Sequence, residues 1–127
     1  MFTIVAERIN CTRKAIREAT ERRDAAFIRE QVAQQADAGA TYLDVNAGAS
    51  PDTEMDNMLW LLEQVQSATT LPISLDSPSA AVVEAGLKAL DGRPALTNTV
   101  KLEAGKAERL LPLVQQYRTK VNGLCLG

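Results

Sequence analysis

The chain has no histidine and only two cysteines, and these absences exclude several kinds of chemistry. Cys11 and Cys125 lie far apart in the sequence and neither belongs to a CxxC pair, so a thiolate-rich zinc site is excluded. A mechanism that uses histidine as its general base is excluded as well. We expect both cysteines to be small buried or loop residues without a redox role, and we expect no metal site.

Long apolar runs and blocks of one charge are also lacking. The longest apolar runs, such as Met58–Leu62, are far shorter than the roughly 20 residues that span a bilayer, and no secretory signal opens the chain. Fourteen basic residues stand against sixteen acidic ones, with no block long enough to bind a polyanion. The composition therefore predicts a cytoplasmic protein that binds neither membranes nor nucleic acid.

What the sequence does contain is an alternation of two kinds of segment within 127 residues, 46% of them apolar. That length suits one compact domain, and no linker marks a second. Short apolar runs predict five buried strands. They are Phe2–Ile9, Thr41–Val45, Ile73–Leu75, Ala95–Thr97 and Val121–Leu126.

Stretches with helical spacing separate these strands. Asp24 is expected to cap the first full helix and Gly39 to follow its end, after a shorter helical stretch from Thr12 to about Thr20. Three further helices are predicted, each from a start signal or an apolar stripe. The first begins near Thr53, with Asp56 as its capping-box partner. The second begins at Ser77-Pro78 and stops at Asp91-Gly92. The third covers Glu103–Tyr117, with a kink at Pro112.

The helix near Thr53 is expected to turn Met55, Leu59, Leu62 and Val65 toward the core, with Met58 and Trp60 as further core residues. Strand and helix in alternation predict a parallel sheet with right-handed crossovers. An open doubly wound sheet and a closed eight-stranded barrel both fit this order. Length alone favours the open sheet, because a full barrel needs about 250 residues.

Polar side chains follow the predicted strands at the point where each strand ends. In both architectures the ligand site is built at the carboxyl ends of the strands. Buried carboxylates and amides are costly without partners, so several of them on one rim predict a polar ligand or a dense mutual network. They are Glu7, Arg8 and Asn10; Asp44 and Asn46; Asp76 and Ser77; and Thr97, Asn98 and Thr99.

Carboxylates and carboxamides suit a flat heterocycle whose edge alternates donors and acceptors. An ionised aspartate accepts two parallel N–H bonds from an amino-pyrimidinone, and an asparagine offers both a donor and an acceptor to the adjoining edge. No GxGxxG or GxxxxGK[ST] motif is present, so dinucleotides and nucleoside triphosphates lack their usual cradle. Gly105-Lys106 is more simply the solvated start of a helix.

Four of the strand-end segments resemble those of the pterin-binding methyltransferases, in the same order and spacing. The family includes the methyltetrahydrofolate:corrinoid/iron–sulfur protein methyltransferase and the folate domain of cobalamin-dependent methionine synthase. The segments that carry the resemblance are Ala6-Glu7-Arg8-Ile9-Asn10, Leu43-Asp44-Val45-Asn46-Ala47-Gly48, Ser74-Leu75-Asp76-Ser77 and Leu96-Thr97-Asn98-Thr99.

The resemblance implies an α/β fold that is the first five β/α units of a (β/α)₈ TIM barrel, with parallel strands and outer helices. Residues 1–127 would then be the N-terminal part of a single pterin-binding barrel domain. Gly127 departs from the family, which usually has Asn or Asp there. In the family, further pterin contacts come from strands six and seven, which have no counterpart in residues 1–127. We therefore expect residues 1–127 alone to bind pterin weakly and to catalyse little or no methyl transfer.

In the family, an aspartate ending strand three and an asparagine ending strand four hydrogen-bond the pterin ring. Those positions correspond to Asp76 and Asn98, which we predict to be the catalytic pair. Further pterin-site residues, expected in supporting roles on the same rim, are Ser77, Glu7, Asn10, Asp44 and Asn46.

The activity implied is methyl transfer between methyltetrahydrofolate and the cobalt of cobalamin carried by a partner corrinoid protein, without a covalent nucleophile from the barrel. Two alternatives stay open: a dihydropteroate synthase-like enzyme, and an inactive barrel fragment that acts only by association. A homodimer or larger assembly is expected.

A cluster of basic residues, which is usually a solvated face, would also suit an acidic carrier protein. Its members are Arg13, Lys14, Arg17, Arg22 and Arg23.

Overall fold

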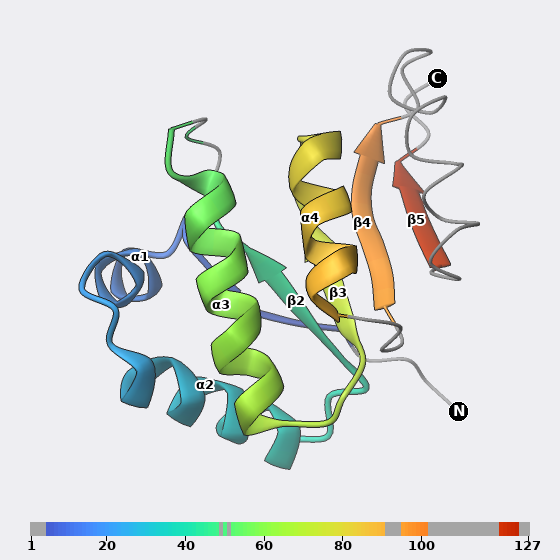
Figure 1. Ribbon diagram of the computed structural model, residues 1–127. Helices are drawn as coiled ribbons and strands as arrows, with labels where there is room; N and C mark the ends of the chain where they lie inside the picture. The colour runs from blue at the N-terminus through green and yellow to red at the C-terminus, as the bar shows by residue number, and fades with distance from the viewer. Residues whose placement is uncertain (1–4, 49, 51, 91–94, 102–119, 125–127) are drawn as a thin grey trace.

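The computed structural model describes residues 5–48, 50, 52–90, 95–101 and 120–124 (Figure 1). Five strands occur among them: β1 (Val5–Asn10), β2 (Tyr42–Asn46), β3 (Ile73–Asp76), β4 (Ala95–Lys101) and β5 (Lys120–Leu124). The four described helices are α1 (Lys14–Glu21), α2 (Ala25–Asp37), α3 (Glu54–Ala68) and α4 (Ala80–Leu90). The helix expected over Glu103–Tyr117, the stop at Asp91-Gly92 and Cys125 lie outside the described residues.

The sheet has the strand order β1-β2-β3-β4-β5, and every neighbouring pair is parallel. A doubly wound sheet reverses its strand order at a switch point, whereas a barrel adds each new strand on the same side of the last. The consecutive order is therefore that of a barrel, and the partial-barrel prediction is confirmed. The open sheet favoured by length alone is wrong.

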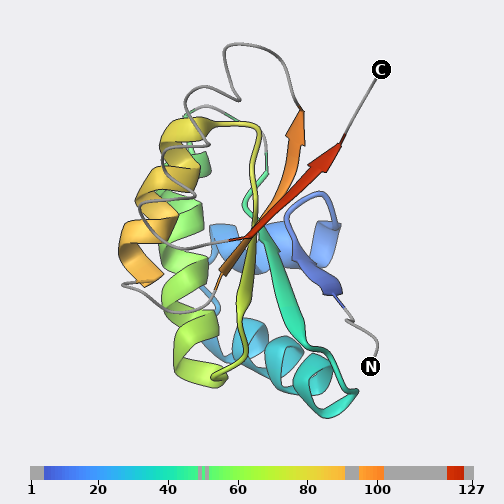
Figure 2. The same cartoon turned by 90° about the vertical axis from the view of Figure 1, so that its right-hand side faces the viewer.

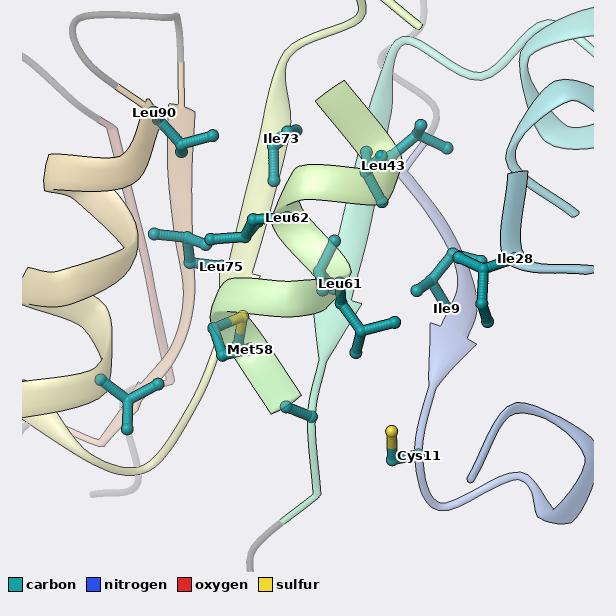
Figure 3. Close-up of a cluster of buried hydrophobic side chains, with 14 of the residues drawn as sticks. Ile9, Cys11, Ile28, Leu43, Met58, Leu61, Leu62, Ile73, Leu75 and Leu90 are labelled. Carbon is teal, nitrogen blue, oxygen red and sulfur yellow. The ribbon is translucent and has the colours of Figure 1, made fainter. Parts of the chain in front are cut away.

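The helices form one layer on one face of the sheet. Figures 1 and 2 show α3 and α4 side by side against the strands, and α3 also packs on α2. Alternate residues of the strands face this layer, because side chains of a strand point to opposite faces in turn. Leu43, Val45, Ile73 and Leu75 are fully buried there together with α3 residues (Figure 3).

Gly86 of α4 marks the closest approach of this layer to the sheet. A Cβ at Gly86 would lie 3.1 Å from Leu75 Cδ1 and 3.4 Å from Leu62 Cδ1, tighter than ordinary contact. Glycine there lets α4 lie against β3 and α3 at once.

The buried face of α3 differs from the prediction by one position. Met58, Leu61, Leu62 and Val65 are buried, whereas Leu59 is 38% exposed. These four recur at steps of three and four residues, which places Leu59 at the edge of the stripe. Trp60 is only partly buried and packs on the margin of the core. The predicted capping box is also wrong, because Thr53 makes no side-chain cap hydrogen bond.

The junction between α1 and α2 contains a residue with an unusual backbone conformation. Arg23 has φ of 56°, a left-handed conformation that is uncommon outside glycine. Arg23 N–H donates to Thr20 O and Asp24 N–H to Ala19 O, which together satisfy the last carbonyls of α1. The Asp24 carboxylate accepts from Phe27 N–H and so caps α2, as predicted. The Arg23 guanidinium donates to Asn57 Oδ1 at 3.0 Å and lies over Trp60, which ties this junction to α3.

Candidate functional site

The polar strand-end residues lie on the sheet face opposite the helices. Asp44 and Asn46 alternate with the buried Leu43 and Val45 of β2, and Ser74 and Asp76 alternate with Ile73 and Leu75 of β3. The register pairs Asp44 with Ser74. In a barrel this face is the interior, and its carboxyl end is the mouth where ligands bind.

Asp76 and Asn98, the two residues predicted to bind the pterin ring, are direct partners in the register of β3 and β4. Residues at partner positions of parallel strands stand at the same level of the sheet, about 4.8 Å apart across the ladder. A planar ring of pterin size is wide enough to contact both strands at once. The backbone therefore brings the two predicted ring-binding residues to one level of the sheet, with Asp76 at the end of β3 and Asn98 in the middle of β4, not at its end as predicted.

Asn46 is joined to Asp76 by a side-chain hydrogen bond. Asn46 Oδ1 accepts from Gly48 N–H at 2.7 Å, and Asn46 Nδ2 donates to Asp76 Oδ2 at 3.2 Å. The Gly48 N–H requires the oxygen of the amide, so it fixes which end of Asn46 faces Asp76. Gly48 has φ of 86°, the left-handed region that favours glycine, so the turn after β2 is built to make this contact. Asn46 thus holds the carboxylate of Asp76 in one orientation.

Asp44 lies one layer deeper than Asn46. Its Oδ1 accepts from Ser74 Oγ at 2.7 Å, and the two side chains are 1% and 0% exposed. A buried carboxylate needs hydrogen bonds to replace its lost hydration, and Ser74 supplies one of them. The pair crosses from β2 to β3 beneath the rim, which fits the supporting role predicted for Asp44. Ser74 was not predicted to be a site residue, although Asp44, its partner in the strand register, was.

The first strand contributes less directly. Asn10 Oδ1 accepts from both the N–H and the hydroxyl of Thr12, at 2.9 and 2.7 Å, and so shapes the turn into α1. The register of β1 shifts between Ala6 and Ile9, and Glu7 is exposed within this irregular stretch. Glu7 therefore stands below the strand end that carries Asn10. Their roles toward a ligand stay predictions.

Ser77 directly follows Asp76 and is tied to the start of α3. Ser77 Oγ donates to Glu54 Oε2 at 2.7 Å and accepts from Ser79 N–H at 3.0 Å. Both Ser77 and Glu54 are 4% exposed. The hydroxyl is thus engaged within the protein, and it organises the turn that opens α4 at Ala80, two residues later than Pro78 predicted. The sequence did not single out Glu54, because a glutamate in the first turn of a helix is ordinarily a surface residue.

Replacing Glu54 by alanine is expected to destabilise the protein by about 1–3 kcal/mol, since it leaves the buried Ser77 hydroxyl with only the Ser79 carbonyl, at 3.5 Å, as an acceptor. Glu54→Gln keeps an acceptor oxygen and should cost less. Asp56→Ala, in the same helical turn but exposed, is the matched control and should change the free energy of unfolding by less than about 0.5 kcal/mol. Chemical denaturation of the three variants measures this. Equal losses for Glu54→Ala and Asp56→Ala would show that the Ser77 contact contributes nothing.

Among the described residues, no group of three or more cysteine or acidic side chains is placed to hold a metal ion. No helix among the described residues is long and apolar enough to cross a bilayer.

The consecutive parallel sheet with its layer of helices is that of the β/α-barrel proteins, a class in which ligands bind at the carboxyl ends of the strands. The comparison with known families gives the family. Residues 6–122 match the model of the pterin binding enzymes, so the chain belongs to this family.

One characterised relative is similar over most of the chain. It is a methylcorrinoid:tetrahydrofolate methyltransferase from Eubacterium limosum, 39% identical over 110 residues. The match covers 87% of this chain but only 40% of the relative.

Proposed function

We propose that the protein is a methyltransferase that moves a methyl group between tetrahydrofolate and the cobalt of a corrinoid carried by a partner protein. The observation that carries the proposal is the placement of Asp76 opposite Asn98, with Asn46 holding the Asp76 carboxylate. The name of the relative, which joins a methylcorrinoid and tetrahydrofolate, supports the choice of substrates.

Asp76 would bind the amino-pyrimidinone edge of the pterin. That edge presents adjacent N–H donors, and a carboxylate can accept two of them at once. Asn46 donates to Oδ2 alone, so Oδ1 and the second lone pair of Oδ2 stay available to a ligand. Asn98, one strand further, would bind the neighbouring edge with its amide. Ser77 would act indirectly, by fixing the turn behind Asp76.

Catalysis in this proposal is positioning and electrostatic stabilisation. The corrinoid supplies the methyl-exchange chemistry at its cobalt, and the barrel provides no covalent nucleophile. Its residues hold the ring so that N5 faces the open mouth, where a second protein can approach. Orientation of two reactants accounts for a large part of such a rate enhancement.

A homodimeric or larger assembly and a cytoplasmic location are further predictions of the same proposal.

The test is methyl transfer by the full-length protein that contains these residues. Tetrahydrofolate and a methylated corrinoid protein are mixed with it, and the absorption spectrum of the corrinoid is followed together with the methyltetrahydrofolate formed. Stoichiometric loss of the cobalt–methyl species and gain of methyltetrahydrofolate is the expected result. Formation of a pteroate from p-aminobenzoate and an activated pterin, without methyl transfer, would instead identify a synthase. Association without pterin binding would show that neither activity is present.

A further inference from the structure

Asp76 is held in two ways, through its own side chain and through the residue that follows it. Asn46 Nδ2 donates to Asp76 Oδ2, which orients the carboxylate but does not act on the backbone that carries it. Ser77 follows directly and turns its side chain to the helix layer, where it is 4% exposed. The backbone at the end of β3 is therefore fixed from the helix side, while Asp76 stands on the opposite face.

Glu54 of α3 is the partner that fixes Ser77. The Ser77 hydroxyl has a single proton and donates it to Glu54 Oε2 at 2.7 Å, whereas the alternative acceptor, Ser79 O, lies at 3.5 Å. Ser77 Oγ accepts in turn from Ser79 N–H at 3.0 Å. Ser79 belongs to the same turn as Ser77. Of these contacts, the one with Glu54 joins the end of β3 to another helix.

Glu54 is itself firmly placed. It lies in the first turn of α3, and its backbone N–H donates to Ser50 O at 2.9 Å. Its side chain is 4% exposed, and a carboxylate is favoured near the N-terminus of a helix. Met58 and Leu61, on the following turns, anchor α3 in the core. The carboxylate is therefore a rigid support for the Ser77 hydroxyl.

A buried carboxylate is a poor source of stability, because an apolar side chain of similar size avoids the cost of desolvation. Its hydrogen bond is directional, however, and so it fixes a geometry that apolar contact does not. Here that geometry is the position of the residue directly before Ser77. Asn46 and Glu54 lie at opposite ends of the connection between β2 and α3, so the two holds on Asp76 come from the two ends of one segment.

From this arrangement we infer that Glu54 is a positioning residue for pterin binding. Acting through Ser77, it sets the place from which Asp76 presents its carboxylate to the ring. The inference rests on the proposed function, in which Asp76 binds the amino-pyrimidinone edge. A small displacement of a binding group weakens its hydrogen bonds to a rigid ring, so Glu54 contributes to affinity without contacting the ligand.

Glu54→Ala is expected to weaken binding of methyltetrahydrofolate about threefold to tenfold, which corresponds to about one net hydrogen bond. Calorimetric titration of the full-length protein measures this at a temperature at which circular dichroism shows the variant to be folded. Glu54→Gln keeps an acceptor oxygen for Ser77, so its affinity should return to within about twofold of wild type.

Methyl-transfer kinetics separate positioning from lost stability. In Glu54→Ala, KM for tetrahydrofolate should rise about threefold to tenfold while kcat changes by less than about twofold, because ring binding is lost equally from the bound substrate and the transition state. Partial unfolding has the reverse effect. It lowers the number of active molecules, and hence the apparent kcat, without changing KM.

Three further variants serve as controls. Val32→Ala removes buried volume from α2, outside the contacts that hold Asp76, and Asp56→Ala removes an exposed carboxylate from the same helical turn as Glu54. Both should keep the wild-type KM. Adding Glu54→Ala to Asp76→Ala should cause no further loss of affinity, because Glu54 acts only through Asp76.

The inference is overturned by unchanged affinity in Glu54→Ala, or by a fall in kcat at constant KM. An equal rise in KM in Val32→Ala also contradicts it, and so does a further loss in the double variant, since Glu54 would then act by another route. Each of these results leaves the proposed function intact if the wild-type protein binds methyltetrahydrofolate and transfers the methyl group. If the wild-type protein binds no folate, the proposed function and the inference fail together.

Discussion

Replacement of Asp76 by alanine is expected to weaken binding of methyltetrahydrofolate by about a hundredfold or more. Two charge-assisted hydrogen bonds to the pterin would be lost, each worth about 1.5–3 kcal/mol, and every 1.4 kcal/mol is about a factor of ten in affinity. The loss should appear equally with a methylated tetrahydropterin that lacks the p-aminobenzoylglutamate tail, because the contacts proposed for Asp76 are all to the ring. Titration calorimetry with both ligands measures it.

Two variants make this result specific. Asp76→Asn keeps the shape and can still accept from Asn46 Nδ2, but it loses the charge, so its affinity should fall between wild type and alanine. Asp37→Asn, at the exposed end of α2, removes the same charge far from the rim and should bind as wild type does. Wild-type affinity in Asp76→Ala would remove Asp76 from the site.

Truncation of Leu62 to alanine should produce the largest loss of stability among the substitutions considered, about 2–5 kcal/mol. Leu62 is fully buried on α3 and reaches the point where Gly86 of α4 lies against Leu75 of β3 (Figure 3). Because the residues around Leu62 are themselves tightly packed and buried, its truncation leaves a cavity that they fill only partially. The midpoint of chemical denaturation of the full-length protein should fall accordingly.

Leu59→Ala on the same helix is the control for this prediction. Leu59 is 38% exposed, so the same change in side chain should cost less than about 1 kcal/mol. Similar losses at both positions would contradict the placement of the α3 stripe. In that case the helix would face the sheet with the side originally expected from the sequence.

Periodicity alone predicted most of the elements but not the architecture. β2 and β3 end at the polar residues Asn46 and Asp76, and Asp24 caps α2 as expected, whereas β4 runs past Asn98 to Lys101 and not only to Thr97. Choosing between an open sheet and a barrel requires knowing which strands are neighbours, and hydrophobic spacing is the same in both. The resemblance supplied that choice, and the consecutive strand order confirmed it.

The candidate site, too, was only partly predictable from the sequence. The sequence placed Asp44, Asn46 and Asp76 near strand ends, and strand register explains why they face the same side. It did not show that Asn46 would bind Asp76, because that depends on the left-handed turn at Gly48. Nor did it indicate Glu54, whose burial arises only when α3 packs over the end of β3.

Leu59 illustrates a limit of helical patterns. An apolar residue at the edge of a stripe satisfies the same spacing as one at its centre, so the sequence alone cannot rank Leu59 below Leu61. Packing of α3 against α2, α4 and β2 decides the matter, since Leu61, Leu62 and Val65 are buried in that contact. The error was confined to the edge of the stripe, since Leu62 and Val65 are buried as predicted, and it did not alter the fold.

The position of the pterin can be determined from a crystal structure of the full-length protein with bound methyltetrahydrofolate. We expect the ring to lie against the end of β3 and Asn98 of β4, with its amino-pyrimidinone edge within hydrogen-bond distance of the Asp76 carboxylate and the Asn98 amide. Asn46 should still donate to Asp76 Oδ2. A pterin bound elsewhere, or Asp76 and Asn98 satisfied by protein groups and closed to the ligand, would contradict it.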